Sequence, residues 1–124
     1  MTKTNTGKAL TKAEEQVMQV LWKIEKGFLK DIVEKMGEPK PHSNTVATLL
    51  KILVDKKFVG TETFGRMNRY SPLVTKQEYS KNTMSSLIKG YFGGSYSKAV
   101  SFLVDEKKLS VQDLELLLQQ LKKK

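Results

Sequence analysis

Asn44, Thr48 and Lys51 are spaced so that they would share one face of a helix. They offer a carboxamide, a hydroxyl with a methyl group, and one long cation. A carboxamide can pair two ways with adenine, and a threonine methyl can pack on a thymine methyl. The candidate major-groove residues are Asn44, Thr45, Thr48 and Lys51, with Ser43 on a phosphate. A helix face that is simply solvated is the alternative.

Residues 41–57 must carry this face. Their large apolar residues recur at i, i+3, i+4 and i+7, which predicts a helix with one buried stripe. That stripe consists of Val46, Leu49, Leu50 and Leu53. Ser43 is expected to cap the helix. The short polar residues would then lie on the opposite side, where a base edge can approach them.

The segment after this helix predicts an antiparallel hairpin. Residues 58–64 are rich in valine, threonine and phenylalanine, Gly65 supplies a turn, and a second run ends at Pro72. The polar residues expected near the tip are Arg66, Asn68 and Arg69. A helix with a small polar face followed by a basic hairpin is typical of a winged helix-turn-helix, with the hairpin on the DNA backbone.

Catalysis and metal binding find little support in the sequence. There is one histidine and no cysteine, which excludes disulfides and thiolate metal sites. No glycine-rich phosphate loop, zinc-binding motif or paired-carboxylate spacing is present. We therefore expect no enzymatic activity, no cofactor and no small-molecule substrate. His42 is either a phosphate contact or simply exposed.

The composition favours a polyanionic partner. The 124 residues carry a formal net charge of +9, with cations in both halves. Solubility without a partner is the alternative reading of that charge. No apolar run is long enough to cross a bilayer, and no signal peptide is evident, so a cytoplasmic location is expected. Residues 1–10 are expected to form a flexible arm.

Helical patterns fill the rest of the first half. Thr11 and Glu14 have capping-box spacing at the start of a helix with an apolar stripe, and residues 28–36 predict a shorter one. With the third helix and the hairpin, residues 11–73 would form a complete DNA-binding domain. The predicted fold is mainly α with a small β-hairpin.

Residues 74–124 predict three further helices, the last beginning at a Ser110–Asp113 cap. So short a segment cannot bury all its large apolar side chains within itself. A second copy of the segment would cover them, and packing against the first domain is the alternative. The expected dimerisation residues are Leu87, Tyr91, Phe102, Leu114, Leu117, Leu118 and Leu121.

From about Leu10 to Leu121, the chain resembles the penicillinase-repressor family (the BlaI/MecI/CopY repressors). The resemblance is carried by the order and spacing of several short stretches. These are residues 10–22, Asn44-Thr-Val-Ala-Thr-Leu-Leu50, Lys56-Lys-Phe-Val59, Tyr70-Ser-Pro-Leu73, Gly93-Gly94 and Leu109-Ser110.

The resemblance implies a homodimeric repressor on a palindromic double-stranded DNA operator of β-lactam-resistance or related genes. It also implies release by a membrane sensor-protease. The family's cut lies between Asn and Phe, and the matching pair here is Ser101-Phe102, so the asparagine is absent. Only Lys51 is basic in the recognition helix, and the cysteine pairs of copper-responsive members are missing. A winged-helix module that binds protein or RNA is the competing function.

Overall fold

The computed structural model describes residues 10–122, and the chain forms two compact units. The first unit ends at Thr83 and the second begins at Met84. Apart from Leu10, the predicted N-terminal arm lies outside the described residues. The mainly helical architecture with a small antiparallel sheet confirms the predicted fold class.

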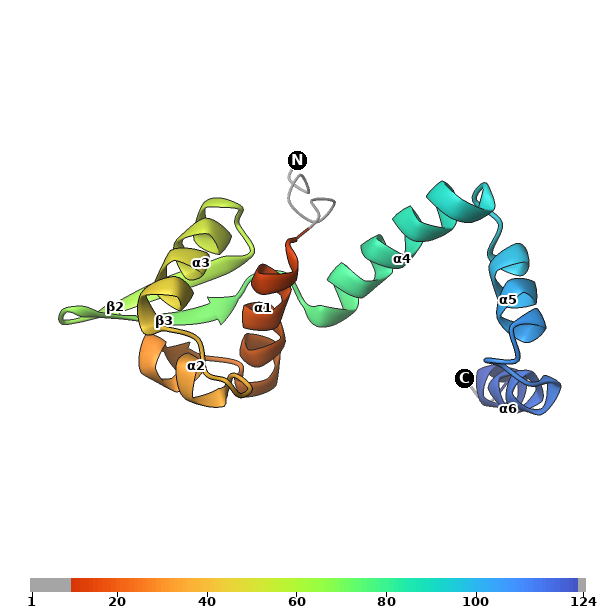
Figure 1. Cartoon of the computed structure of the whole chain (residues 1–124), viewed down its shortest axis with the longest axis horizontal. Helices are drawn as coiled ribbons and strands as arrows, with labels where there is room; N and C mark the ends of the chain where they lie inside the picture. The colour runs from red at the N-terminus through yellow and green to blue at the C-terminus, as the bar shows by residue number, and fades with distance from the viewer. Residues whose placement is uncertain (1–9, 123–124) are drawn as a thin grey trace. The chain divides into compact units, whose positions relative to one another are not determined.

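Three helices form the body of the first unit (Figure 1): α1 (Lys12–Ile24), α2 (Leu29–Lys35) and α3 (Ser43–Asp55). The predicted capping box at the start of α1 is confirmed. The Glu14 amide donates to the Thr11 hydroxyl over 3.1 Å, and the Thr11 amide donates to the Glu14 carboxylate over 3.0 Å. Two amides that have no partner inside the helix are thereby satisfied.

The predicted cap of α3 is wrong by one residue. His42, not Ser43, is the N-cap, and its side chain makes no capping hydrogen bond. The His42 carbonyl accepts from the Val46 amide over 3.2 Å, so the helical ladder starts one residue before Ser43. Ser43 therefore already lies inside the first turn and cannot act as the N-cap.

A three-stranded antiparallel sheet completes the first unit, in the order β1-β3-β2. The hairpin joins β2 (Val59–Phe64) to β3 (Met67–Pro72) through the two-residue turn Gly65-Arg66. Gly65 has φ +63°, which a residue without a Cβ adopts at no steric cost. Figure 1 shows the turn projecting past α2 and α3. The strand β1 (Gly27–Phe28) was not predicted, because two residues show no periodicity.

The core lies where the three helices meet the base of the hairpin. Phe58 and Val59, at the start of the hairpin, are buried against the apolar faces of α1, α2 and α3. The predicted stripe of α3 is confirmed: Val46, Leu50 and Leu53 are fully buried, and Leu49 is partly buried. This packing turns the opposite face of α3 outward.

The helix α4 (Lys76–Phe92) begins in the first unit and continues into the second. The second unit adds α5 (Tyr96–Asp105) and α6 (Val111–Lys122). The predicted cap of α6 is confirmed by reciprocal 3.0 Å hydrogen bonds between Ser110 and Asp113. Among the helices of residues 10–122, none combines the length and apolarity needed to cross a membrane.

Candidate nucleic-acid interface

The outward face of α3 carries three of the predicted base-reading residues. Asn44, Thr48 and Lys51 are all exposed, on the side opposite the buried stripe. Asp55 continues the same face at the end of the helix and is also exposed. One turn of α3 thus presents an amide and a threonine, the next presents a single cation, and an acidic residue marks the far end.

Thr45 and Ser43 lie on the two flanks of this face rather than at its centre. Thr45 lines a hollow with Gln16 and Pro41, between α3 and α1. Ser43 lines a second hollow with Leu29, on the side facing α2. Both residues are exposed. The structure therefore places Thr45 and Ser43 at the edges of a contact surface centred on Asn44, Thr48 and Lys51.

Thr48 has a restricted hydrogen-bonding capacity. Its hydroxyl donates to the Asn44 backbone carbonyl over 3.0 Å. A hydroxyl has one proton, so Thr48 has none left to donate to a base. What remains is the methyl group and the acceptor capacity of the oxygen. These suit a thymine methyl or an exocyclic amino group in the major groove.

The C-terminal end of α3 is tied to the start of α1. Just past the helix, Lys56 donates to the buried Glu14 carboxylate over 2.8 Å. Burial alone would raise the pKa of Glu14, but the hydrogen bonds and charge of Lys56, together with Thr11, lower it below its ordinary value. The Glu14 carboxylate is thus charged in the folded protein, and it holds the start of α1 and the end of α3 together. Sequence reasoning found the cap but not Lys56, which lies 42 residues away.

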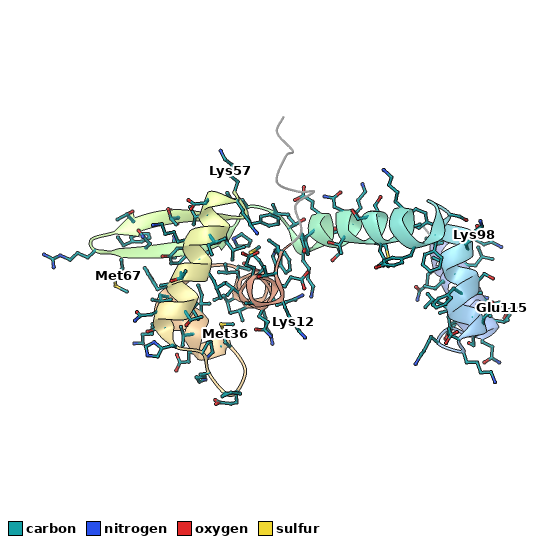
Figure 2. All side chains as sticks on the ribbon, turned by 45° about the horizontal axis from the view of Figure 1, so that its top comes forward. Lys12, Met36, Lys57, Met67, Lys98 and Glu115 are labelled. Carbon is teal, nitrogen blue, oxygen red and sulfur yellow. The ribbon has the colours of Figure 1, made fainter. Side chains whose placement is uncertain are left out.

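Arg66 is the predicted wing residue that occupies the turn itself, and it is exposed. Asn68 is the second residue of β3, and its side-chain oxygen accepts from the Thr63 hydroxyl over 3.1 Å. This bond links the two strands next to the turn. Figure 2 shows Met67 beside the same turn, where its side chain is about half exposed.

Arg69, the third residue predicted near the tip of the wing, lies further from the turn than Arg66 and Asn68. Arg69 is the third residue of β3, directly opposite Glu62 in the strand register. Its guanidinium donates to the Glu62 carboxylate over 2.6 Å and lies 4.8 Å from the centre of the Phe64 ring. The hydrogen bond from Arg69 lowers the pKa of Glu62. The strand pairing therefore gives Arg69 a partner within the hairpin.

Tyr79, near the start of α4, is a second residue whose polar contacts sequence reasoning missed. Its side chain is buried, with 7% exposed. Its hydroxyl nevertheless donates to the Glu15 carboxylate over 2.9 Å and accepts from the Leu10 amide over 3.3 Å. Trp22 beside it donates from its indole nitrogen to the Val74 carbonyl over 2.8 Å. These hydrogen bonds join residues 52 to 69 positions apart, so no local sequence pattern could have predicted them.

His42 lies exposed at the mouth of α3. Within residues 10–122, no group of three or more histidine, cysteine, aspartate or glutamate side chains is arranged to hold a metal ion.

The predicted dimerisation residues lie mostly uncovered on α4, α5 and α6. Leu114 is partly buried, and the others are between 45% and 79% exposed. They are Leu87, Tyr91, Phe102, Leu117, Leu118 and Leu121. In α6 no residue is fully buried. Figure 2 labels Lys98 on α5 and Glu115 on α6, which are both exposed.

The predicted cleavage residues Ser101 and Phe102 lie inside α5 and are exposed. The Phe102 ring packs against Phe92 at 5.6 Å between ring centres. Its carbonyl accepts from the Glu106 amide over 2.9 Å. A protease that needs an extended substrate would have to unwind this part of α5.

Comparison with known proteins places the chain in a family of repressors. The penicillinase repressor family model matches residues 10–123. An uncharacterized 16.5 kDa protein of the ptsI 3′ region of Latilactobacillus sakei is 32% identical over 90% of this chain and 77% of that protein. The penicillinase repressor of Bacillus licheniformis is 23% identical over 89% of this chain and 87% of that protein.

The fold of the first unit has a solved counterpart. The solution structure of the DNA-binding domain of the repressor BlaI matches 56% of this chain and 87% of that domain. The TM-score is 0.51 and the sequence identity 24%. This likeness agrees with the winged-helix arrangement of α1 to α3 and the β2–β3 hairpin.

Proposed function

The chain belongs to the penicillinase repressor family, and from that premise we propose that it is a transcriptional repressor that binds duplex DNA through its first unit. The observation that carries the proposal is the outward face of α3. It combines exposed Asn44, Thr48 and Lys51 on a helix whose other face is locked into the core. Such a face can enter a major groove without rearrangement.

In this proposal Asn44 pairs with an adenine edge, and Thr48 reads a neighbouring thymine methyl or amino group. Lys51 supplies the cation within the groove, and Thr45 and Ser43 contact its walls. Arg66 reaches the phosphate backbone from the wing turn. Arg69 attracts the DNA phosphates less strongly than Arg66 does, because its guanidinium is already paired with the Glu62 carboxylate.

We further propose that the second unit joins two chains into a homodimer. The support is its uncovered apolar surface, above all the stripe of Leu114, Leu117, Leu118 and Leu121 on α6. A two-fold dimer would present two α3 helices to a palindromic operator. The second contact is then intramolecular, and the apparent affinity exceeds that of one half-site.

The family resemblance also supports release by proteolysis at Ser101-Phe102, triggered by a membrane sensor-protease in response to β-lactams or a related signal. A cut there would separate α6 and its apolar stripe from the DNA-binding unit. Dimer contacts would be lost, and with them the avidity on the operator.

Recovery of bound DNA by affinity selection from random duplexes tests the proposal. We expect enrichment of an inverted repeat whose half-sites are about 10 base pairs or a multiple apart, centre to centre. Affinity for that duplex should fall steeply with salt, with a slope of roughly −0.9 per phosphate neutralised. Enrichment of no common sequence, with binding equal on single-stranded RNA, would instead favour an interaction module.

A further inference from the structure

Two adjacent carboxylates in the first turn of α1 hold different helices. Glu14 accepts from Lys56, just past the end of α3. Glu15 accepts from the Tyr79 hydroxyl, near the start of α4. The first turn of α1 therefore fixes both the helix proposed to read DNA and the helix that leads out of the DNA-binding unit. The Lys56 contact belongs to the placement of α3 described above, whereas the Tyr79 contact has no role there.

The ring of Tyr79 is held by aromatic contacts, and its hydroxyl is held by hydrogen bonds. Its ring contacts Phe58 edge-on, with ring centres 5.8 Å apart, and Trp22 at 5.9 Å. These contacts bury the ring and belong to the core. The hydroxyl is held separately by Glu15 and by the Leu10 amide. A ring contact tolerates sliding and rotation, whereas a hydrogen bond has a narrow range of distance and angle.

The protonation state of the Tyr79 hydroxyl suits this contact. Burial raises the pKa of Tyr79, and Glu15 raises it further, whereas hydrogen bonds with the Leu10 amide and the Thr83 side chain oppose the shift. The phenol therefore keeps its proton at physiological pH and remains a donor. A hydrogen bond to a charged carboxylate is stronger than one between neutral groups.

The helix that Tyr79 anchors is uninterrupted from Lys76 to Phe92, and the boundary between the units falls within it. Its first turn is also capped, because the Glu78 amide donates to the Thr75 hydroxyl and the Thr75 amide donates to the Glu78 carboxylate, each over 3.0 Å. The first turns of α4, which belong to the first unit, are thus held at Tyr79, and the segment just before them is held by the Trp22–Val74 hydrogen bond.

We propose that Tyr79 and Glu15 are positioning residues that set the half-site spacing this protein accepts. They touch no DNA. They hold the first turns of α4 against α1, and α4 is the chain connection between the first unit and the second. The inference rests on the proposed dimeric operator binding, and it adds a determinant of operator spacing that lies outside the recognition helix.

The test uses four variants of the full chain. Tyr79→Phe removes the hydroxyl and keeps the ring in the core. Glu15→Ala removes the acceptor, and Glu15→Gln restores an uncharged acceptor at the same place. Tyr96→Phe is the matched control, because Tyr96 is an exposed tyrosine of α5 outside every contact described here. Each variant is titrated with duplexes carrying the selected half-site once, or twice at spacings changed by one and two base pairs.

Wild-type protein and Y96F should lose about tenfold in affinity when the half-sites are moved by one base pair from the preferred spacing. In Y79F and E15A that loss should shrink to about threefold or less, while E15Q keeps most of the wild-type preference. Affinity for the single half-site should stay within about twofold in all variants. A purely structural role would lower single-site affinity and leave the spacing preference unchanged.

Hydrogen exchange supplies a readout without DNA. Backbone amides of residues 76–83 should exchange at least about threefold faster in Y79F and E15A than in wild type, with α3 unchanged. A wild-type spacing preference that survives intact in Y79F and E15A would overturn the inference and leave the proposed function standing. Wild-type protein with no spacing preference at all would overturn dimeric operator binding, and this inference with it.

Discussion

The two units of this chain treat their apolar residues differently. In the first, the large side chains of α1, α2, α3 and the hairpin base close around one another, and many are fully buried. Among residues 84–122, the buried apolar residues are Ile88 and Ala99, while both α5 and α6 expose large ones. Similar helical periodicity thus produces a closed core in one unit and an open surface in the other.

Polar contacts follow the same division. In the first unit, side chains bridge elements far apart in sequence, as in Glu14 with Lys56 and Trp22 with Val74. The side-chain hydrogen bonds found within residues 84–122 are helix caps, at Ser95 and Ser110. The difference indicates that the first unit is stabilised by its own tertiary contacts, whereas residues 84–122 make few such contacts among themselves. This difference is the reason for proposing that a second copy covers the second unit.

The largest expected effect separates the two kinds of apolar residue. Leu50→Ala should destabilise the protein by about 2–5 kcal/mol, because a fully buried leucine leaves a cavity. Leu103→Ala, at a 40% exposed position of α5, should cost far less in a monomer. Urea unfolding followed by the fluorescence of Trp22, the single tryptophan, measures the first unit. Equal costs for the two variants would contradict a closed core in that unit.

The buried ion pair of the first unit should give the next largest effect. Lys56→Met leaves the Glu14 carboxylate buried without its cation, and we expect a loss of about 1–3 kcal/mol. Lys51→Met, which removes an exposed cation from the same helix, is the matched control and should leave unfolding nearly unchanged. Thermal unfolding of both variants at neutral pH decides whether α1 and α3 are held together by this pair.

The same pair predicts a pH dependence. The folded pKa of Glu14 lies below its unfolded value, so the carboxylate stabilises the protein above the unfolded pKa. That contribution is lost as the pH falls through the folded pKa. Wild type and Glu14→Gln should therefore differ most in stability near neutral pH and converge in acid. A difference that grew in acid would show that the shift has the opposite sign.

DNA reading is expected to reside in the first unit alone. Asn44→Ala should cost about 1–3 kcal/mol at one base pair of the selected site and little elsewhere. Arg66→Ala should weaken binding to all duplexes alike and reduce the salt slope by about 0.9. Arg69→Ala should act in the same direction but less, because Arg69 is already paired with Glu62. Base preference that changed in R66A but not in N44A would reverse the proposed orientation.

The smallest effect concerns the open surface of the second unit. Leu117→Ala should raise the dimer dissociation constant by about tenfold, or ~1.4 kcal/mol, through lost apolar burial. Leu116→Ala removes a leucine that is 60% exposed and lies off the Leu114–Leu117–Leu118–Leu121 stripe, and it should change the constant by no more than about twofold. Sedimentation across a concentration series measures both. A monomeric wild-type chain at micromolar concentration would refute the reading of this surface as a dimer contact.

Much of this arrangement follows from local sequence. The spacing of Val46, Leu50 and Leu53 determined which face of α3 is buried, and so which face is free for DNA. The Thr11 and Ser110 caps determined where two helices begin. These features depend on residues within one or two helical turns of each other, and for that reason periodicity and capping chemistry reveal them.

Other features exist only once the chain has folded. The strand register, not the sequence spacing, places Arg69 opposite Glu62 and so leaves Arg66 to occupy the wing turn. The Tyr79 hydroxyl meets Glu15 across 64 positions of sequence. Pattern alone assigns Tyr79 to the core, because its ring is apolar and only its last atom is polar. Which partner such an atom finds is decided by how α1 and α4 pack, and that is a property of the tertiary structure.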